Sequence, residues 1–231
     1  MKILMIDNNI DQPWGLCADF RRYLEGQVVV RRAPQSDLPK DLSRFTHVVL
    51  SGSRTCILDS DPWVKDLMAF VRRVVDGGTP MLGICYGHQI IARAHGGDGT
   101  VRISPTPEIG WVEIRQTAPN PVLEGLPKKF HTFQSHFEEV CKAPAGFVPT
   151  ATTERCAIQA YYVEGKPVFG VQFHPERDAQ EGEESIKKRR SATPPVPNDC
   201  IFNEGKAKSV YSENVARTIF NNFLRQRGSS Q

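Results

Sequence analysis

The stretch from Thr79 to Ala92, TPMLGICYGHQIIA, decides how this chain folds. Its apolar run Met81–Ile84 predicts a buried strand, and the residues after Cys85 suit a helix better. Cys85 therefore stands at a strand-to-helix junction between Gly83 and Gly87, the pattern of a nucleophile elbow with cysteine in place of serine. A turn this tight strains the backbone at the nucleophile, and a Cβ at either flanking glycine would collide with the neighbouring strand or helix.

The junction also gives the Cys85 sulfur a chemical setting. The following helix points its N-terminus at the sulfur, which favours thiolate over thiol. The backbone N–H of Tyr86 is left free to bind an oxyanion that develops during acyl transfer. Taken alone, the motif G-x-C-x-G leaves a second interpretation open, a buried cysteine in an ordinary strand–helix turn.

Length and composition limit the kind of protein. The chain has 231 residues, 39% of them hydrophobic and 24% charged, as in globular proteins of one large domain or two small ones. The net charge of +3 is too small to indicate a nucleic acid or a membrane surface as partner. The N-terminus enters a strand pattern without a secretory signal, and the six cysteines are scattered. We therefore predict reduced thiols, a cytoplasmic location, and neither a nucleic-acid nor a membrane partner.

Strand and helix patterns alternate ahead of the junction. Apolar runs predict strands over residues 2–6, 27–30 and 45–50. After the third of these, Asp61 and Pro62 predict a helix start, and apolar residues recur on one face from Val64 to Val75. This alternation predicts an α/β fold with a mostly parallel central sheet and helices on both faces.

The second half of the chain is richer in strands and then in polar residues. Residues 101–103, 110–114 and 129–133 predict shorter strands that form a small antiparallel sheet. Residues 177–209 are acidic, then basic, then proline-rich, without a periodic apolar stripe, so we expect a solvated loop. A segment that docks a partner protein is the alternative. A buried stripe predicts a last helix over residues 215–224. The whole chain, residues 1–231, is thus predicted to be a single domain with a polar insertion at 177–209.

A second strand end carries a candidate catalytic pair. The apolar run 167–173 leads into His174, Pro175 and Glu176. Proline holds this short segment rigid, and the Glu176 carboxylate can reach back to the imidazole, as the acid does in a hydrolase triad. A surface turn is the alternative interpretation of this tripeptide by itself.

Gly52 follows a third strand end, that of residues 45–50. In parallel sheets, sites form beyond the carboxyl ends of the strands. If the strand before Gly52 lies beside the strand before Cys85, the N–H of Gly52 or Ser53 can supply a second oxyanion donor. A plain turn glycine is the alternative.

The two motifs together resemble the class I, triad-type glutamine amidotransferases. The resemblance is carried by Gly83-Ile-Cys-Tyr-Gly-His-Gln89 and Phe169-Gly-Val-Gln-Phe-His-Pro-Glu176. It implies a flavodoxin-like α/β fold and a thioester route for hydrolysis of the side-chain amide of glutamine, with no metal and no cofactor. The residues it assigns are catalytic Cys85, His174 and Glu176, oxyanion-binding Gly52 and Tyr86, and substrate-binding Gln89, Ser135 and His136. For His136, a structural histidine in a strand or turn is the alternative.

Among the branches of this family, residues 108–114 and 134–136 look most like the glutaminase portion of GMP synthase. Two departures accompany that likeness. Gly52-Ser-Arg54 stands where that branch has Gly-Gly-Pro, and the insertion at 177–209 is longer than usual. Since the sequence contains no ATP-binding domain, the resemblance implies that ammonia passes to a separate acceptor synthetase. A free-standing γ-glutamyl peptidase and a non-catalytic scaffold protein are the competing interpretations.

Overall fold

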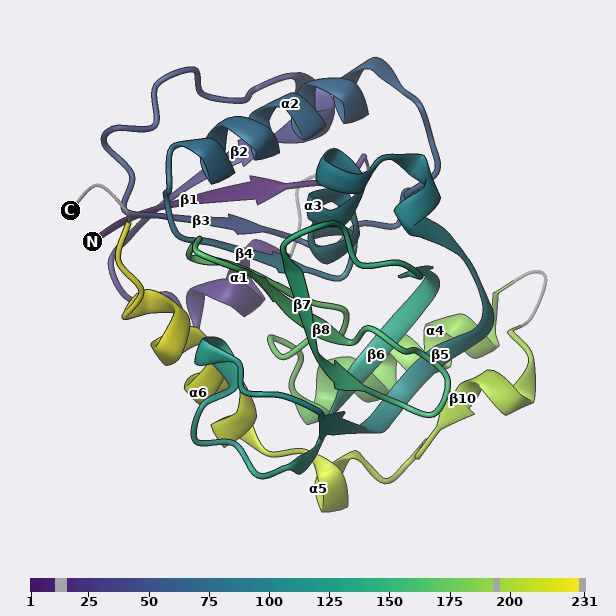
Figure 1. The fold of residues 1–231 in the computed structure, drawn as a ribbon. Coiled ribbons are helices and arrows are strands. Elements are labelled where there is room, and N and C mark those ends of the chain that lie inside the picture. The colour runs from purple at the N-terminus through teal and green to yellow at the C-terminus, as the bar shows by residue number, and fades with distance from the viewer. Residues whose placement is uncertain (11–15, 193–195, 229–231) are drawn as a thin grey trace.

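The computed structural model describes residues 1–10, 16–192 and 196–228, and its strands form one ten-stranded sheet with helices on both sides (Figure 1). The strands are β1 (Lys2–Asp7), β2 (Gln27–Arg32), β3 (His47–Leu50), β4 (Met81–Ile84), β5 (Val101–Gln116), β6 (Lys129–Val140), β7 (Phe147–Thr152), β8 (Ala160–Val163), β9 (Val168–Val171) and β10 (Ile201–Phe202). The helices are α1 (Leu16–Arg21), α2 (Pro62–Asp76), α3 (Tyr86–Gly96), α4 (Ala179–Arg190), α5 (Ala207–Val210) and α6 (Glu213–Leu224). No helix in the three described ranges is long and apolar enough to cross a membrane.

The five strands that position the candidate site are parallel to one another. Their order is β2–β1–β3–β4–β9, so β4 is hydrogen-bonded to β3 on one side and to β9 on the other. The carboxyl ends of parallel strands meet at one edge of a sheet. Cys85, which follows β4, therefore lies between Gly52, which follows β3, and His174, which follows β9.

The other strands continue the same sheet in mainly antiparallel pairs. β8 joins β9, and the order runs on through β7, β5 and the parallel edge strand β10, with β6 paired to β5. The predicted antiparallel part therefore exists, but it is hydrogen-bonded to the parallel part. Residues 101–103 and 110–114 belong to one 16-residue strand, β5, rather than to two short ones. Pro105 and Pro107 between them cannot donate to the ladder, and the register against β6 shifts there.

Alternate residues of β1 point to opposite faces of the sheet, and both faces are covered. Leu4 and Ile6 pack with α2 and α3, whereas Ile3 and Met5 pack with α1 and α6. This confirms the predicted parallel sheet with helices on both faces. α2 begins at Pro62 as predicted, although the side chain of Asp61 makes no capping hydrogen bond.

The segment 177–209 is folded, and the prediction of a solvated loop is wrong for most of it. It contains α4, β10 and α5, while its residues 193–195 lie outside the described part of the chain. α4 buries Gly182 and Ile186, which pack against β5 and β6. Two buried positions are too few to produce the apolar stripe that predicts a helix, so this helix depends on contacts with residues distant in sequence.

The start of α4 is tied to the end of α1. Asp178 and Glu181 form a capping box, in which each carboxylate accepts the backbone N–H of the other. Arg22, directly after α1, reaches both carboxylates at 2.8 Å and donates to the carbonyl of Glu176 at 2.9 Å. The helix is therefore anchored at the residue that ends the His-Pro-Glu motif.

Gly83 and Gly87 leave no room for a side chain. A Cβ on Gly83 would run into the backbone of Gly87, and a Cβ on Gly87 would run into the carbonyl group of Leu50. We expect Gly87→Ala to lower the free energy of unfolding by about 2–3 kcal/mol, because closely packed backbones must move apart. Urea unfolding measures the change. Gly99→Ala, where a Cβ meets open space, is the control, and an equal loss in both variants would contradict the account.

Candidate active site

Cys85 has the strained backbone expected of a nucleophile elbow. Its φ of 52° and ψ of −106° lie in a region that residues with a side chain rarely adopt. Its N–H donates to the carbonyl of Val171 at 2.9 Å, which fixes the turn to β9. Tyr86 is the first residue of α3, so its N–H has no acceptor within the helix, and none occurs elsewhere in the described part of the chain.

His174 and Glu176 form a buried pair directly after β9. Nδ1 of His174 lies 2.7 Å from Oε1 of Glu176, whose side chain is fully buried. Burial works to lower the pKa of His174, but the charges of Glu176 and Cys85, and hydrogen bonds to both, outweigh it and raise the pKa to about 10. The ring therefore stays protonated at neutral pH, so a positive charge stands beside the Cys85 sulfur.

The structure brings Cys85, His174 and Gly52 to one point. The charge of Cys85 is one of the causes that raise the pKa of His174, so the sulfur acts on this ring. A Cβ built on Gly52 would lie 3.0 Å from Cε1 of His174 and 3.6 Å from Cβ of Cys85, so the Gly52 backbone runs directly beside the pair. Backbone N–H groups of Gly52 and Tyr86 thus stand near the sulfur, an arrangement suited to binding a developing oxyanion.

Asn8 and Asn9, which follow β1, hold the Gly52 loop in place, and neither was among the predicted site residues. Nδ2 of Asn8 donates to the carbonyl of Ser51 at 2.7 Å, and Nδ2 of Asn9 donates to the carbonyl of Gly52 at 3.2 Å. The Ser53 hydroxyl donates to the carbonyl of Asn8 at 2.8 Å. These bonds use the carbonyl groups of the loop and leave the Gly52 N–H for another partner. Asn8 and Asn9 come directly after a strand of the parallel sheet, and this position is the sequence signal that could have identified them.

A pocket of about 360 Å³ opens beside His174. Gly52 and His174 line it, and so does Ser135, one of the residues predicted to hold the substrate. The cationic residues in its lining are Arg54, Arg177, Lys188 and Arg189. All but the first of these come from the segment 177–209, whose fold the sequence did not predict, so the charge of the pocket was not predicted either.

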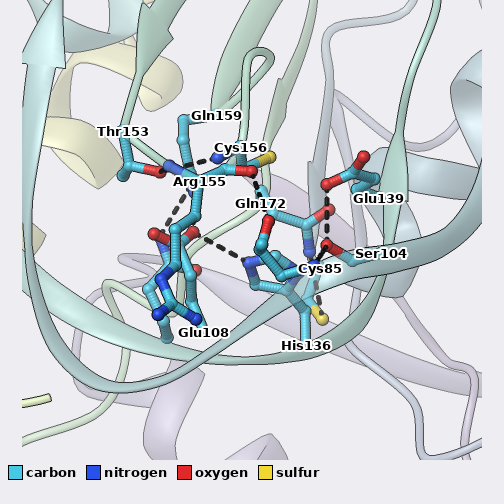
Figure 2. A network of polar contacts seen from close by, with 12 residues as sticks. Cys85, Ser104, Glu108, His136, Glu139, Thr153, Arg155, Cys156, Gln159 and Gln172 are labelled. Carbon is cyan, nitrogen blue, oxygen red and sulfur yellow. Dashed lines mark hydrogen bonds and ion pairs between the residues drawn. The ribbon is translucent and has the colours of Figure 1, made fainter. Parts of the chain in front are cut away.

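Gln89 and His136, also predicted to hold the substrate, are not among the described residues that line the pocket. Nε2 of Gln89 donates to the carbonyl of Glu138 at 2.8 Å and to Oε1 of Gln172 at 3.0 Å. The ring nitrogens of His136 lie 3.0 Å from the carbonyl of Glu138 and 3.1 Å from Oε2 of Glu108 (Figure 2). Both side chains are buried and already hydrogen-bonded within the protein, so their geometry favours a supporting role.

Gln172, which was not among the predicted site residues, connects this buried network to Cys85. Its Nε2 lies 3.6 Å from Sγ of Cys85, and its Oε1 accepts the bond from Gln89. An amide N–H directed at sulfur stabilises negative charge there, in addition to the charge of His174. Gln172 stands two residues before His174, and the period of two along an extended chain is the signal that could have found it.

Among the described residues, Glu108, His136 and Cys156 place one possible metal-ligand atom each within 4.8 Å of one another. Oε2 of Glu108 already accepts a hydrogen bond from Nε2 of Gln159 at 2.7 Å and one from His136 (Figure 2). Burial raises the pKa of the Cys156 thiol, which disfavours the thiolate that a metal requires. Hydrogen bonding within the protein accounts for this cluster.

Comparisons relate the chain to known proteins. A family model described as glutamine amidotransferase class-I matches residues 4–191. One subunit of the glutamine-hydrolyzing GMP synthase of Thermococcus kodakarensis is 43% identical over 97 residues, which cover 42% of this chain and 50% of that protein. The corresponding GMP synthase subunit from Sulfolobus acidocaldarius is 34% identical over 150 residues, which cover 64% of this chain and 77% of that protein.

The chain is also similar to a longer GMP synthase and to a solved structure. The glutamine-hydrolyzing GMP synthase of Listeria monocytogenes is 36% identical over 143 residues, but the matched region covers only 26% of that protein. The chain thus spans half or less of the Thermococcus and Listeria proteins. A glutamine amido transferase from Methylobacillus flagellatus superposes with a TM-score of 0.78 and 25% identity, over 99% of this chain and 96% of that one.

Proposed function

This chain belongs to the glutamine amidotransferase class-I family, and we propose from that premise that it hydrolyses the side-chain amide of glutamine to glutamate and ammonia. One observation carries the proposal: Nδ1 of His174 lies 2.7 Å from Oε1 of Glu176, and a Cβ on Gly52 would touch both the same ring and Cβ of Cys85. The single sheet that runs through the described residues supports one domain of this family, with α4 and α5 placed before α6.

Cys85 is the nucleophile in this reaction. Its sulfur attacks the amide carbon, and the N–H groups of Gly52 and Tyr86 bind the oxyanion. His174 gives its proton to the departing ammonia, and a thioester on Cys85 remains. It then takes a proton from the water that hydrolyses the thioester. Glu176 holds the ring in the orientation that both proton transfers require.

Substrate binding divides between the pocket and the buried network that contains Gln89 and His136. Ser135, in the pocket wall, contacts the amino-acid end of glutamine. Gln89 and His136 hold their places through the buried hydrogen bonds, and they support the walls of the site without touching the substrate. This assignment moves two of the three predicted substrate-binding residues into supporting roles.

The ammonia passes to a separate acceptor synthetase. The Thermococcus and Sulfolobus relatives are each named as one subunit of a glutamine-hydrolyzing GMP synthase, which supports a synthetase as the partner. A cytoplasmic location fits this role, because the cysteines Cys56, Cys85, Cys141, Cys156 and Cys200 are free thiols, as expected in a reducing compartment.

Gly52→Ala should lower kcat for glutamine about 10- to 100-fold while leaving the fold intact. The added Cβ would crowd the His174 ring at 3.0 Å and push the oxyanion donor away from the sulfur. Steady-state kinetics measures the change in kcat, and a thermal melt measures whether the fold is intact. Gly99→Ala is the control, and full activity in Gly52→Ala would remove the Gly52 N–H from the oxyanion site.

The function itself is tested by measuring glutamate and ammonia released from glutamine, with and without the ATP-dependent synthetase of the same organism. We expect hydrolysis of glutamine in both cases and transfer of nitrogen to the acceptor only with the partner present. Failure of the purified chain to hydrolyse glutamine under either condition would contradict the proposal. Comparison with γ-glutamyl dipeptides separates it from the free-standing peptidase.

A further inference from the structure

Arg189, on α4, lines the active-site pocket together with Ser135 and His174. Its half-buried side chain donates to Oγ of Ser135 at the long distance of 3.4 Å and stacks over Phe137, 5.0 Å from the centroid of the ring. In the part of the chain that the structure describes, its guanidinium makes no other hydrogen bond and belongs to no ion pair. A guanidinium has several N–H donors, so most of these remain for a partner that enters the pocket.

The charge of Arg189 is not compensated by the residues around it. Burial lowers the pKa of Arg189, and the charge of Arg54 lowers it further. The charges of Cys85 and Glu138 act in the opposite direction, but neither residue forms an ion pair with the guanidinium. Taking a charged group out of water costs free energy unless a partner offsets the loss. An anion bound beside Arg189 would offset it.

Two other cationic residues of the pocket lining are less suited to bind such an anion. Nη1 of Arg177 lies 3.1 Å from Oδ2 of Asp19, so this side chain already has a carboxylate. Lys188 is exposed, and water competes for its charge. The planar guanidinium of Arg189 presents neighbouring N–H groups that match the two oxygens of a carboxylate. Arg189 therefore offers a carboxylate the better site.

The amino-acid end of glutamine brings a carboxylate that needs such a partner. The resemblance to the family gave that end to Gln89, Ser135 and His136. Gln89 and His136 are instead hydrogen-bonded within the protein and are not among the described residues of the pocket lining. Ser135 remains, and its hydroxyl carries no charge to balance the carboxylate.

The pocket can hold both ends of one glutamine. His174, which acts at the reacting amide, and Arg189 line the same pocket of about 360 Å³, a volume within the range of small-molecule sites, which begins at about 300 Å³. Only a short chain of carbon atoms separates the amide of glutamine from its α-carboxylate. The Ser135 hydroxyl and the Arg189 guanidinium, which are already neighbours, can both donate to that carboxylate.

We propose that Arg189 binds the α-carboxylate of glutamine, beside Ser135, and so selects amides of amino acids over other amides. The inference rests on the proposed hydrolysis of glutamine and adds the residue that determines its specificity. Because α4 lies within the insertion at 177–209, this insertion forms part of the substrate site.

Two substrates that differ in the α-carboxylate test the inference: glutamine and 4-aminobutanamide, which keeps the amide and the amino group and has hydrogen in place of the carboxylate. Ammonia release measures both reactions. Wild type should show a kcat/KM for glutamine about 10-fold or more above that for 4-aminobutanamide, since hydrogen bonds between charged groups have this strength. Arg189→Met should raise KM for glutamine about 10-fold and leave kcat within about 3-fold, because a contact to the unreacting end acts on binding.

The same variant should not lower the turnover of 4-aminobutanamide, which has no group for Arg189 to hold. Arg189→Lys should recover part of the affinity for glutamine, because the charge returns without the paired N–H groups. Should Arg189→Met fail to fold in a thermal melt, Arg189→Gln removes the charge and keeps a polar side chain. Equal kcat/KM for the two substrates in wild type would overturn the inference, and so would an unchanged KM for glutamine in the folded variant.

Two lysines of α4 provide the controls. Lys187→Met removes an exposed charge outside the described pocket lining and should leave the ratio of the two kcat/KM values as in wild type. Lys188→Met removes an exposed charge from the lining itself, and should reduce the ratio by less than about 3-fold, because exposed charges interact weakly. A loss in Lys188→Met as large as that in Arg189→Met would assign the effect to the general charge of the pocket and overturn the inference.

Binding measured without turnover separates the inference from the function on which it rests. Titration calorimetry with glutamine should give Cys85→Ala a Kd about 10-fold lower than that of the double variant Cys85→Ala/Arg189→Met. Hydrolysis of glutamine with a KM that does not depend on Arg189 overturns the inference and leaves the glutaminase proposal standing. Binding of glutamine that depends on Arg189, without hydrolysis that depends on Cys85, overturns the glutaminase proposal alone.

Discussion

Cys85→Ala should lose about 10,000-fold or more of its glutamine-hydrolysing activity and still fold as the wild type does. The sulfur is the only protein atom that forms a bond to carbon in the proposed reaction, so no neighbouring group can replace it. Cys85 is a small buried residue of the core, so its replacement by alanine removes a single sulfur atom and should leave the surrounding packing in place. Ammonia release measures the loss, and circular dichroism with a thermal melt measures the fold.

Cys141→Ala is the control for this variant. Cys141 is a free thiol whose sulfur makes a weak hydrogen bond to the carbonyl of Gly99, far along the chain from the elbow. It should retain full activity. Residual activity of Cys85→Ala within about 10-fold of wild type would exclude a covalent route through this sulfur.

His174→Gln should lower kcat about 1,000-fold or more and slow the alkylation of Cys85 by iodoacetamide at pH 6. The charges of Glu176 and Cys85 overcome burial and raise the pKa of His174 to about 10, so wild type contains an imidazolium beside the sulfur throughout the range below that value. Glutamine side chains carry no charge, so the variant loses the group that stabilises the thiolate. Peptide mapping after brief labelling shows which thiol reacts fastest.

The sign of the pH effect follows from the raised pKa. The stability that protonated His174 contributes is fully present below its ordinary pKa of about 6.5 and is lost as the pH rises through about 10. The stability difference between wild type and His174→Gln should therefore shrink over that interval. His95→Gln, at the exposed end of α3, is the control. Unchanged Cys85 alkylation at pH 6 in His174→Gln would contradict the ion pair.

The elbow could be predicted from sequence because its signals are local. A short apolar run, two glycines and a cysteine fix a strand, a turn and a helix start within a few residues, and the structure confirms β4 and α3 there. The meeting of Cys85 with Gly52 and His174 required one more rule, that the carboxyl ends of neighbouring parallel strands share an edge. The strand order, with β4 between β3 and β9, was not predicted, and the structure supplies it.

The segment after Glu176 could not be predicted in the same way. α4 has only Gly182 and Ile186 buried, and its stability depends on Arg22 and on side chains of β5 and β6 that are distant in sequence. Its cationic residues look like a solvated charge run until the helix is seen to form one wall of the pocket. Arg189 therefore had no local signal.

Burial explains the changed assignments of His136 and Gln89. Their sequence positions match those of substrate-binding residues in the family, but matching positions do not reveal which atoms are already hydrogen-bonded. The ring of His136 is occupied by Glu108 and Glu138, and the Gln89 amide by Glu138 and Gln172. These hydrogen bonds become visible only when β5 and β6 are seen packed against α3.

The central claim is a covalent γ-glutamyl thioester on Cys85, and mass spectrometry of acid-quenched enzyme tests it most directly. Wild type mixed with glutamine and quenched within milliseconds to seconds should gain the mass of one glutamyl group, on the peptide that contains Cys85. The same experiment with Cys85→Ala should show no adduct. Continued turnover of glutamine with no adduct, or with the adduct on another thiol, would contradict the account.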